Sequence, residues 1–192
     1  MTVTRGPGVR IETARLVLRL KEPRDAPLLK AAIDMSLPEL RQWMPWAMEE
    51  PSELDVIEQR IARFRDEFHA GVDFTFGIFD PAELEILGGC GLHPGIGDDA
   101  LELGYWIRSD VVGRGYATEA AAALTTAALR DVGVARVQIR CDPANVASAA
   151  IPRKLGYRHI ETLIANACTP DGAPRDTLIW EMVRPAETSV DG

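Results

Sequence analysis

One glycine-punctuated run, Val112-Gly-Arg-Gly-Tyr-Ala-Thr118, has the residue types and spacing of an anion-binding site. Apolar residues alternate over 101–107 and predict a strand before the run, while the Ala- and Leu-rich stretch 116–132 predicts a helix after it. The first turn of a helix has about four backbone N–H groups without intrahelical partners and a partial positive charge. Gly113 and Gly115 would let an anion approach those groups closely. The alternative is that both glycines only form a tight connection.

Asn145 and Ser148 form a second group, between a predicted strand at 136–141 and a predicted helix at 147–155. Asparagine is a good N-cap residue, and a residue three positions later faces the same side as a helix begins. Taken alone, this spacing fits a helix cap followed by an ordinary small residue equally well.

Together the two motifs resemble those of the GNAT N-acetyltransferases, and Gly-Arg-Gly-Tyr-Ala-Thr-Glu-Ala is most similar to their RimJ/RimL branch. The resemblance implies acetyl-CoA as the cofactor, with its pyrophosphate on the backbone N–H groups of the first motif. It also implies that Asn145 hydrogen-bonds to the pantetheine arm and that Ser148 lies near the sulfur. The residues expected to contact the cofactor are Trp106, Ile107, Arg108, Val112, Gly113, Arg114, Gly115, Tyr116, Ala117, Thr118, Asn145 and Ser148.

The chain departs from the family pattern at two positions. Val112 stands where Gln or Arg is usual, although the backbone donors matter more than that side chain. Pro152 stands where many members have a tyrosine that protonates the leaving thiolate. Ser148 would then donate or relay this proton, unless water neutralises the thiolate.

Direct transfer to an amine requires a group that removes a proton and donors that stabilise the negative charge on the thioester oxygen. Backbone N–H groups near 106–108 are the expected donors, and Glu102, on the face of Gly104 and Trp106, is the first candidate for the base. A solvated strand carboxylate is the alternative for Glu102. Glu161 is the second candidate. His93 is predicted to be a surface or capping residue, and His69 and His159 are predicted to be surface residues.

The segment Leu37–Ala47 fits neither helix nor strand periodicity and contains Trp43 and Trp46 among prolines. Such a stiff apolar segment can plug a core or line a pocket. By the family resemblance, both tryptophans would shape the acceptor pocket. Asp110 is expected to form a turn, and Glu119 to interact with the helix dipole.

The remaining periodicities predict one mixed α/β domain with a mostly antiparallel sheet flanked by helices. Strands are expected at 16–20, 74–79, 86–92, 101–107, 136–141, 157–165 and 177–183, with a closing turn at Asp171-Gly172. Helices are expected at 24–35, 52–71, 116–132 and 147–155, and Ser52 is expected to cap the second. This order is similar to that of the GNAT fold, so a single domain is expected over 10–185, with flexible ends at 1–9 and 186–192.

Composition narrows the function classes only modestly. A formal net charge of −8 argues against non-specific nucleic-acid binding as the main activity and is compatible with a cationic acceptor. No apolar run is long enough to span a bilayer. Three cysteines without metal-like spacing fit a reducing cytoplasm, and each is expected to be buried.

The sequence therefore predicts an acetyl-CoA-dependent N-acetyltransferase whose acceptor is a primary amine, such as the N-terminus of a ribosomal protein. A small amine, an amino acid or an antibiotic remains open as the acceptor, and so does a longer acyl group. A non-catalytic acyl-CoA-binding module is the hypothesis from another class. The sequence leaves the oligomeric state open, with a homodimer as one option.

Overall fold

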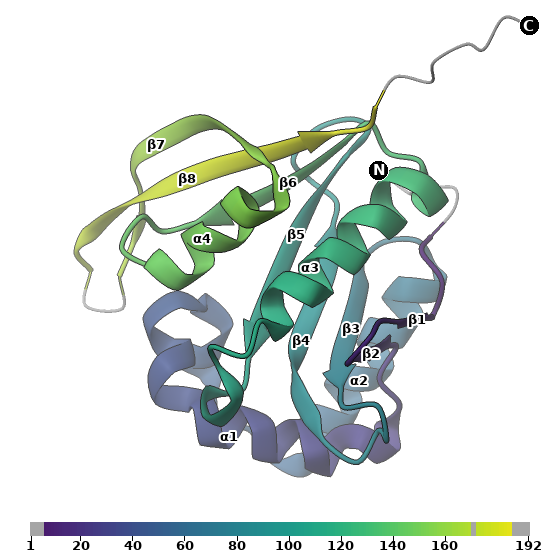
Figure 1. Cartoon of the computed structure of the whole chain (residues 1–192). Helices are drawn as coiled ribbons and strands as arrows, with labels where there is room; N and C mark the ends of the chain where they lie inside the picture. Colours follow the sequence, from purple (N-terminus) through teal and green to yellow (C-terminus); the bar gives the residue numbers. More distant parts are fainter. Residues whose placement is uncertain (1–5, 170–171, 186–192) are drawn as a thin grey trace, which may run out of the picture.

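The computed structural model describes residues 6–169 and 172–185. Their strands form one sheet in the order β1-β2-β3-β4-β5-β6-β8-β7 (Figure 1). The strands are β1 (Arg10–Glu12), β2 (Val17–Arg19), β3 (Phe74–Phe79), β4 (Ile86–His93), β5 (Ala100–Ile107), β6 (Arg136–Cys141), β7 (Arg158–Cys168) and β8 (Pro174–Val183). The α-helices are α1 (Ala26–Trp43), α2 (Leu54–His69), α3 (Tyr116–Ala127) and α4 (Val146–Leu155). This arrangement confirms the predicted mixed α/β fold.

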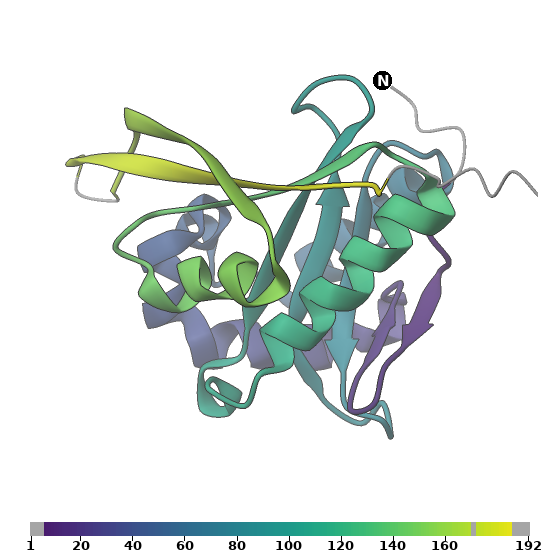
Figure 2. The ribbon, with the colours of Figure 1, turned by 45° about the horizontal axis from the view of Figure 1, so that its top comes forward.

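Helices cover both faces of the sheet, with α3 and α4 on one face and α1 and α2 on the other (Figures 1 and 2). Leu124 of α3 and Leu103 of β5 belong to one buried apolar cluster, and Ile33 of α1 and Ile57 of α2 belong to a second. Full burial of each such side chain stabilises the fold by about 1.5–3 kcal/mol. The two clusters hold the sheet as the middle layer of the domain. Among the described residues, no helix combines the length and apolarity needed to cross a membrane.

The sheet opens between β5 and β6, which are its parallel neighbours. These strands pair only from Ala100↔Arg136 to Glu102↔Gln138. Beyond that point β5 stays with β4, whereas β6 continues along β8 as far as the pair Cys141↔Leu178. One edge of β5 therefore loses its partner over its last residues, and a gap widens toward the strand end that leads into α3.

The helix expected to end at Met35 continues through Pro38 to Trp43, so the prediction of an irregular segment from Leu37 was wrong. Proline inside a helix removes a hydrogen bond and costs about 3 kcal/mol. Leu37 and Leu40 extend the apolar face of α1 into the second cluster. Packing thus outweighs the local cost. A 3-10 helix, η2 (Pro45–Glu49), follows.

Three other boundaries differ from the sequence prediction. Ser52 does not cap α2: its Oγ accepts from Arg60 Nη2 (2.9 Å), and the N-cap residue is Glu53, directly before Leu54. The strand predicted at 16–20 is the second arm of a short hairpin, because β2 pairs with β1, and a buried Pro7 precedes this hairpin. A π turn (Ala128–Val132) completes the predicted helix after α3. Residues 1–5, 186–192 and Asp171 of the predicted closing turn lie outside the described residues.

Candidate active site

The turn that opens α3 has the backbone geometry of an anion site. Gly113 and Gly115 have φ values of +77° and +82°, a region that glycine enters at no steric cost. Gly115 is the N-cap of α3, and in the part of the chain that the structure describes no side-chain cap closes the first turn. A Cβ added at Gly113 would meet no atom within 4 Å, so this side of the turn is open. The N–H groups of this turn therefore remain available to a negatively charged ligand.

Arg15, from the β1–β2 hairpin, holds the turn in place and was not predicted as a site residue. Its Nη1 donates to the Arg114 carbonyl (2.9 Å), and its Nε donates to Glu119 Oε2 (2.7 Å). Burial raises the pKa of Glu119, but hydrogen bonds from Thr13 and Arg15 outweigh this and hold that pKa below its usual value. The guanidinium also lies 5.0 Å from the centre of the Tyr116 ring. Arg15 thus neutralises the Glu119 charge beside the turn, and Arg114 is the cation that the turn itself carries.

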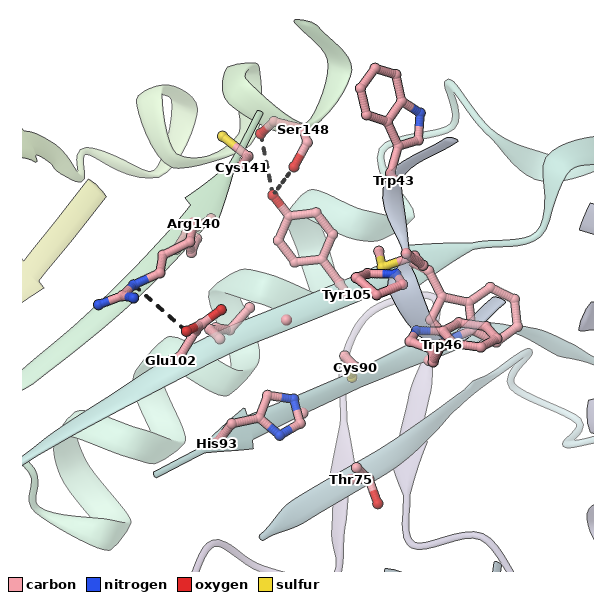
Figure 3. A pocket seen from close by; sticks show the side chains of 18 of the residues that line it. Trp43, Trp46, Thr75, Cys90, His93, Glu102, Tyr105, Arg140, Cys141 and Ser148 are labelled. Atoms are coloured by element: carbon pink, nitrogen blue, oxygen red, sulfur yellow. Dashed lines mark hydrogen bonds and ion pairs between the residues drawn. The ribbon is translucent and has the colours of Figure 1, made fainter. Parts of the chain in front are cut away.

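A pocket of about 720 Å³ opens where β5 and β6 diverge (Figure 3). Its wall includes Trp43, Trp46, His93, Glu102, Tyr105 and Ser148, which come from α1, η2, β4, β5 and α4. Trp43 and Trp46, which were predicted to shape an acceptor pocket, both line this pocket. The ring centres of Trp46 and Trp106 are 6.1 Å apart, and Trp106 lies over Gly89, where a Cβ would come within 2.5 Å of the indole nitrogen.

The backbone donors of β5 divide between its two edges. The Arg108 N–H donates to the Leu87 carbonyl (2.8 Å), so it cannot also bind a thioester oxygen, contrary to the expectation from sequence. Because donors alternate along an antiparallel strand, the Trp106 N–H faces β4 as well. The N–H groups of Tyr105 and Ile107 face the gap. Of the expected residues 106–108, Ile107 is thus the one whose N–H is free to donate to a thioester oxygen in the gap.

The Arg108 side chain is also committed elsewhere. Its Nε donates to Asp110 Oδ1 (2.6 Å), and its Nη2 donates to Glu85 Oε2 (3.0 Å). The hydrogen bond with Asp110 and that with Glu85 raise the pKa of Arg108. Arg108 therefore anchors the strand end, and Asp110 is its partner in the turn.

Tyr105 and Ser148 form a hydroxyl pair across the gap (Figure 3). Tyr105 Oη lies 3.1 Å from Ser148 Oγ and donates to the Ser148 carbonyl at 3.2 Å. That carbonyl would accept from residue 152 in a regular helix, but Pro152 has no N–H. The proline therefore frees the acceptor that Tyr105 occupies. Burial raises the pKa of Tyr105, which keeps the phenol protonated.

Asn145 caps α4, as its sequence position predicted. Its side-chain oxygen accepts from the Ser148 N–H at 3.1 Å, and the residue lines the pocket. With the oxygen engaged in the cap, the Nδ2 group is the part of Asn145 that can donate to a ligand carbonyl.

Two titratable residues, Glu102 and His93, lie on the other wall of the pocket. Glu102 faces the pocket and lies 3.6 Å from Arg140 Nε. His93, predicted to be a surface or capping residue, is partly exposed and also lines the pocket, and its Nδ1 lies 2.7 Å from Asp73 Oδ1. Glu161 is exposed on β7 and is not among the residues that line this pocket. The structure thus brings His93, rather than Glu161, beside Glu102.

His69 and His159 are exposed, as predicted. Cys90 and Cys141 are buried, but Cys168 on β7 is exposed, which corrects the expectation for that cysteine. Within the described residues, no group of three or more His, Cys, Asp or Glu side chains could hold a metal ion.

An open, positively charged turn, unpaired strand donors and an adjoining pocket are the parts that an acyl-CoA-dependent acyltransferase needs. A model of the GNAT acetyltransferase domain matches residues 15–158, so the chain belongs to the GNAT acetyltransferase family. It is an acyl-CoA-dependent N-acetyltransferase, and coenzyme A in its acetylated form is the cofactor.

Three comparisons illustrate the relationship. The chain is 29% identical over 181 residues, 93% of each protein, to the ribosomal protein uS5-alanine N-acetyltransferase of Escherichia coli (strain K12). A solved RimL ribosomal L7/L12 α-N-protein acetyltransferase in complex with coenzyme A superposes with a TM-score of 0.82 at 20% identity, covering 91% of this chain and 97% of that one. The ribosomal-protein-S5-alanine acetyltransferase of Vibrio fischeri also gives 0.82, at 19% identity and over 94% and 100% of the two chains. These superpositions confirm the predicted GNAT fold.

The residues present fit coenzyme A. The diphosphate would lie on the N–H groups of residues 113–117, where two positive-φ glycines remove side-chain bulk and Arg15 offsets the negative charge of Glu119. The pantetheine arm would follow the unpaired edge of β5 past Asn145.

Proposed function

We propose that the protein transfers the acetyl group of acetyl-CoA to the N-terminal amine of another protein, and that a ribosomal protein is its acceptor. The E. coli relative, which matches 93% of the chain, is named for that activity and supports this acceptor class. The observation that carries the proposal is the gap between β5 and β6, because it opens toward the α3 turn at one end and into the pocket along its side. A ribosomal acceptor would place the reaction in the cytoplasm.

Acetyl-CoA, when bound, supplies a thioester carbonyl that a free amine can attack. The Ile107 N–H, on the unpaired edge of β5, would donate a hydrogen bond to the carbonyl oxygen as negative charge develops there. The backbone donor is rigid because β4 holds the other edge of the same strand. The chain therefore needs no side-chain nucleophile of its own.

Ser148 would deliver a proton from its Oγ to the departing sulfur, with Tyr105 as the group behind it. The two hydroxyls are 3.1 Å apart, so the Tyr105 hydroxyl could turn from the Ser148 carbonyl and donate a hydrogen bond to Ser148 Oγ as that oxygen gives up its proton, and solvent would then return a proton to Ser148. The raised pKa of Tyr105 keeps the phenol protonated throughout the neutral pH range, so it remains a hydrogen-bond donor to Ser148. This pair takes the place of the tyrosine that the family often has at position 152.

The acceptor would enter between the two tryptophans and Glu102. Trp43 and Trp46 give the wall an apolar surface, and the Glu102 carboxylate attracts an ammonium group. The formal net charge of −8 would favour approach of a basic polypeptide end. The turn at residues 112–117 (the donor turn), the gap between β5 and β6 and the pocket all belong to one chain, so the proposal does not depend on a homodimer.

The test is acetylation of a peptide that copies the N-terminus of a ribosomal protein, followed by mass spectrometry. The same peptide with a blocked N-terminus and one internal lysine is the matched control. We expect one acetyl group on the free N-terminus and none on the blocked peptide. Acetylation of the internal lysine alone, or of small amines but no peptide, would contradict the assigned acceptor class.

A further inference from the structure

A row of polar side chains crosses the sheet beside the pocket. In the register of the sheet, His93 is opposite Glu102 of β5, and Glu102 is opposite Gln138 of β6. The pair Phe74↔Leu92, continued by one residue, brings Asp73 opposite His93 on the other side. Residues of one such row share a face of the sheet, so the three titratable groups face the same space.

The contacts of His93 define which of its nitrogens is free. Nδ1 lies 2.7 Å from Asp73 Oδ1, and that carboxylate oxygen also accepts the Phe74 N–H at 2.8 Å. A carboxylate only accepts hydrogen bonds, so the proton of the neutral imidazole is on Nδ1. Nε2 then carries the lone pair. The carboxylate and the backbone together fix the tautomer and the ring orientation.

Two glycines let the ring lie flat on the sheet and aim Nε2 along it. A Cβ at Gly91 would come within 2.7 Å of both Cε1 and Nε2, and a Cβ at Gly104 would lie 3.4 Å from Nε2. Gly104 directly precedes Tyr105, at the part of β5 that borders the gap. Nε2 therefore faces the interior of the acceptor pocket (Figure 3).

Glu102 differs from His93 in its partners. Its carboxylate lies 3.6 Å from Arg140 Nε, and its oxygens can also accept hydrogen bonds from an ammonium group. His93 has an anion behind it and an open lone pair in front, which is the arrangement of a general base. Lys21, in the segment after β2, and Cys90 of β4 line the same pocket.

We propose that His93, oriented by Asp73, takes the proton from the acceptor ammonium, while Glu102 binds that ammonium. This inference rests on the proposed function. The N–H bond of the ammonium breaks, a proton moves to His93 Nε2, and the electron pair stays on the amine nitrogen. Gly104 and Ile107 are three residues apart, on the order of 10 Å along a strand, so a water molecule would carry the proton over part of this distance.

The first test measures turnover and acetyl-CoA affinity in His93→Gln, with His159→Gln as the matched control on β7. We expect turnover of His93→Gln to fall on the order of a hundredfold or more, within the range of lost acid–base catalysis. Acetyl-CoA affinity and folding should stay unchanged, and His159→Gln should behave as the parent. Glu102→Gln should instead raise the KM for the acceptor.

Two further variants separate catalysis from structure. Removal of the ring in His93→Ala leaves a space above Gly91 and Gly104, and added imidazole should restore turnover there but not in Glu102→Gln. Asp73→Asn should lower kcat with little change in KM. The double variant Asp73→Asn/His93→Gln should be no slower than His93→Gln alone, because Asp73 acts only through the ring.

Turnover of His93→Gln within about twofold of the parent, failure of imidazole to restore His93→Ala, or additive losses in the double variant would each overturn the assignment. A parent enzyme that acetylates no peptide would instead defeat the proposed acceptor class. The histidine variants would then be measured with whichever amine is acetylated. The two failures are therefore distinguishable.

Discussion

Replacing Lys21 by methionine should stabilise the folded protein. Lys21 is only 6% exposed, and its Nζ lies 6.0 Å from the centre of the Phe64 ring. Within residues 6–169 and 172–185, no carboxylate forms an ion pair with it. Burial lowers the pKa of Lys21 from 10.5 to about 8, and the neighbouring Cys90 only partly offsets this. A buried charge without a partner costs free energy that a methionine of similar length would not.

The magnitude follows from the two pKa values. A tenfold change in proton affinity corresponds to about 1.4 kcal/mol, so the interval from 10.5 to about 8 corresponds to roughly 3 kcal/mol. Below pH 8 both folded and unfolded chains carry the proton, and the folded state bears the full cost. Between pH 8 and 10.5 the unfolded chain holds a proton that the folded chain has released, so the parent becomes more stable as the pH rises.

The assay is guanidinium unfolding of the parent and Lys21→Met at several pH values from 7 to 10. At pH 7 the variant should exceed the parent in free energy of unfolding by up to about 3 kcal/mol, and the difference should shrink toward pH 10. Lys154→Met, at an exposed position of α4, is the matched control and should change stability by less than about 0.5 kcal/mol at every pH. A difference that does not vary with pH, or a variant less stable than the parent, would refute the reasoning.

Three other substitutions test the donor turn and the hydroxyl pair. Gly115→Glu should abolish acetyl-CoA binding in calorimetry by adding charge and bulk at the diphosphate position. Gly172→Glu, which carries similar backbone strain at φ +85° at an exposed position, should bind normally. Equal affinities of the two variants would remove the turn from the site. Tyr105→Phe should lower turnover roughly a hundredfold with acetyl-CoA affinity unchanged, and parental turnover would leave water as the proton source. Pro152→Ala restores a backbone N–H that competes with the Tyr105 hydroxyl for the Ser148 carbonyl. The free energy of unfolding should rise by roughly 1 kcal/mol, and turnover should fall. An increase in turnover would contradict the role given to the proline.

The donor turn could be predicted from the sequence because everything that makes it is local. Glycines at 113 and 115, a strand before them and an alanine-rich helix after them are adjacent in the chain. Arg15 could not be predicted in the same way, since it reaches the turn from a hairpin about a hundred residues earlier. Local sequence likewise failed at Pro38, where packing of Leu40 continues the helix.

The Asp73–His93 contact depends on strand register, which the sequence does not specify here. Both hairpin strands were predicted, but a register shift between Ile78 and Phe79 changes which residues face one another. A one-residue error moves every side chain to the opposite face. With the bulge unknown, the sequence left His93 as a lone histidine beside a proline. The same holds for Tyr105 and Ser148, which meet across a gap between strands.

The two sides of the site are built from different kinds of chemical group. The donor side consists of main-chain groups fixed by left-handed glycines and by pairing with β4, whereas the acceptor side consists of side chains from α1, η2 and neighbouring strands. Substitution of Trp43 or Trp46 would change which amines fit the pocket and leave the binding of acetyl-CoA unchanged. Acceptor specificity can therefore change during evolution while acetyl-CoA binding is kept. The end of α1 and η2, which carry Trp43 and Trp46, is the segment to mutate when a new acceptor is wanted.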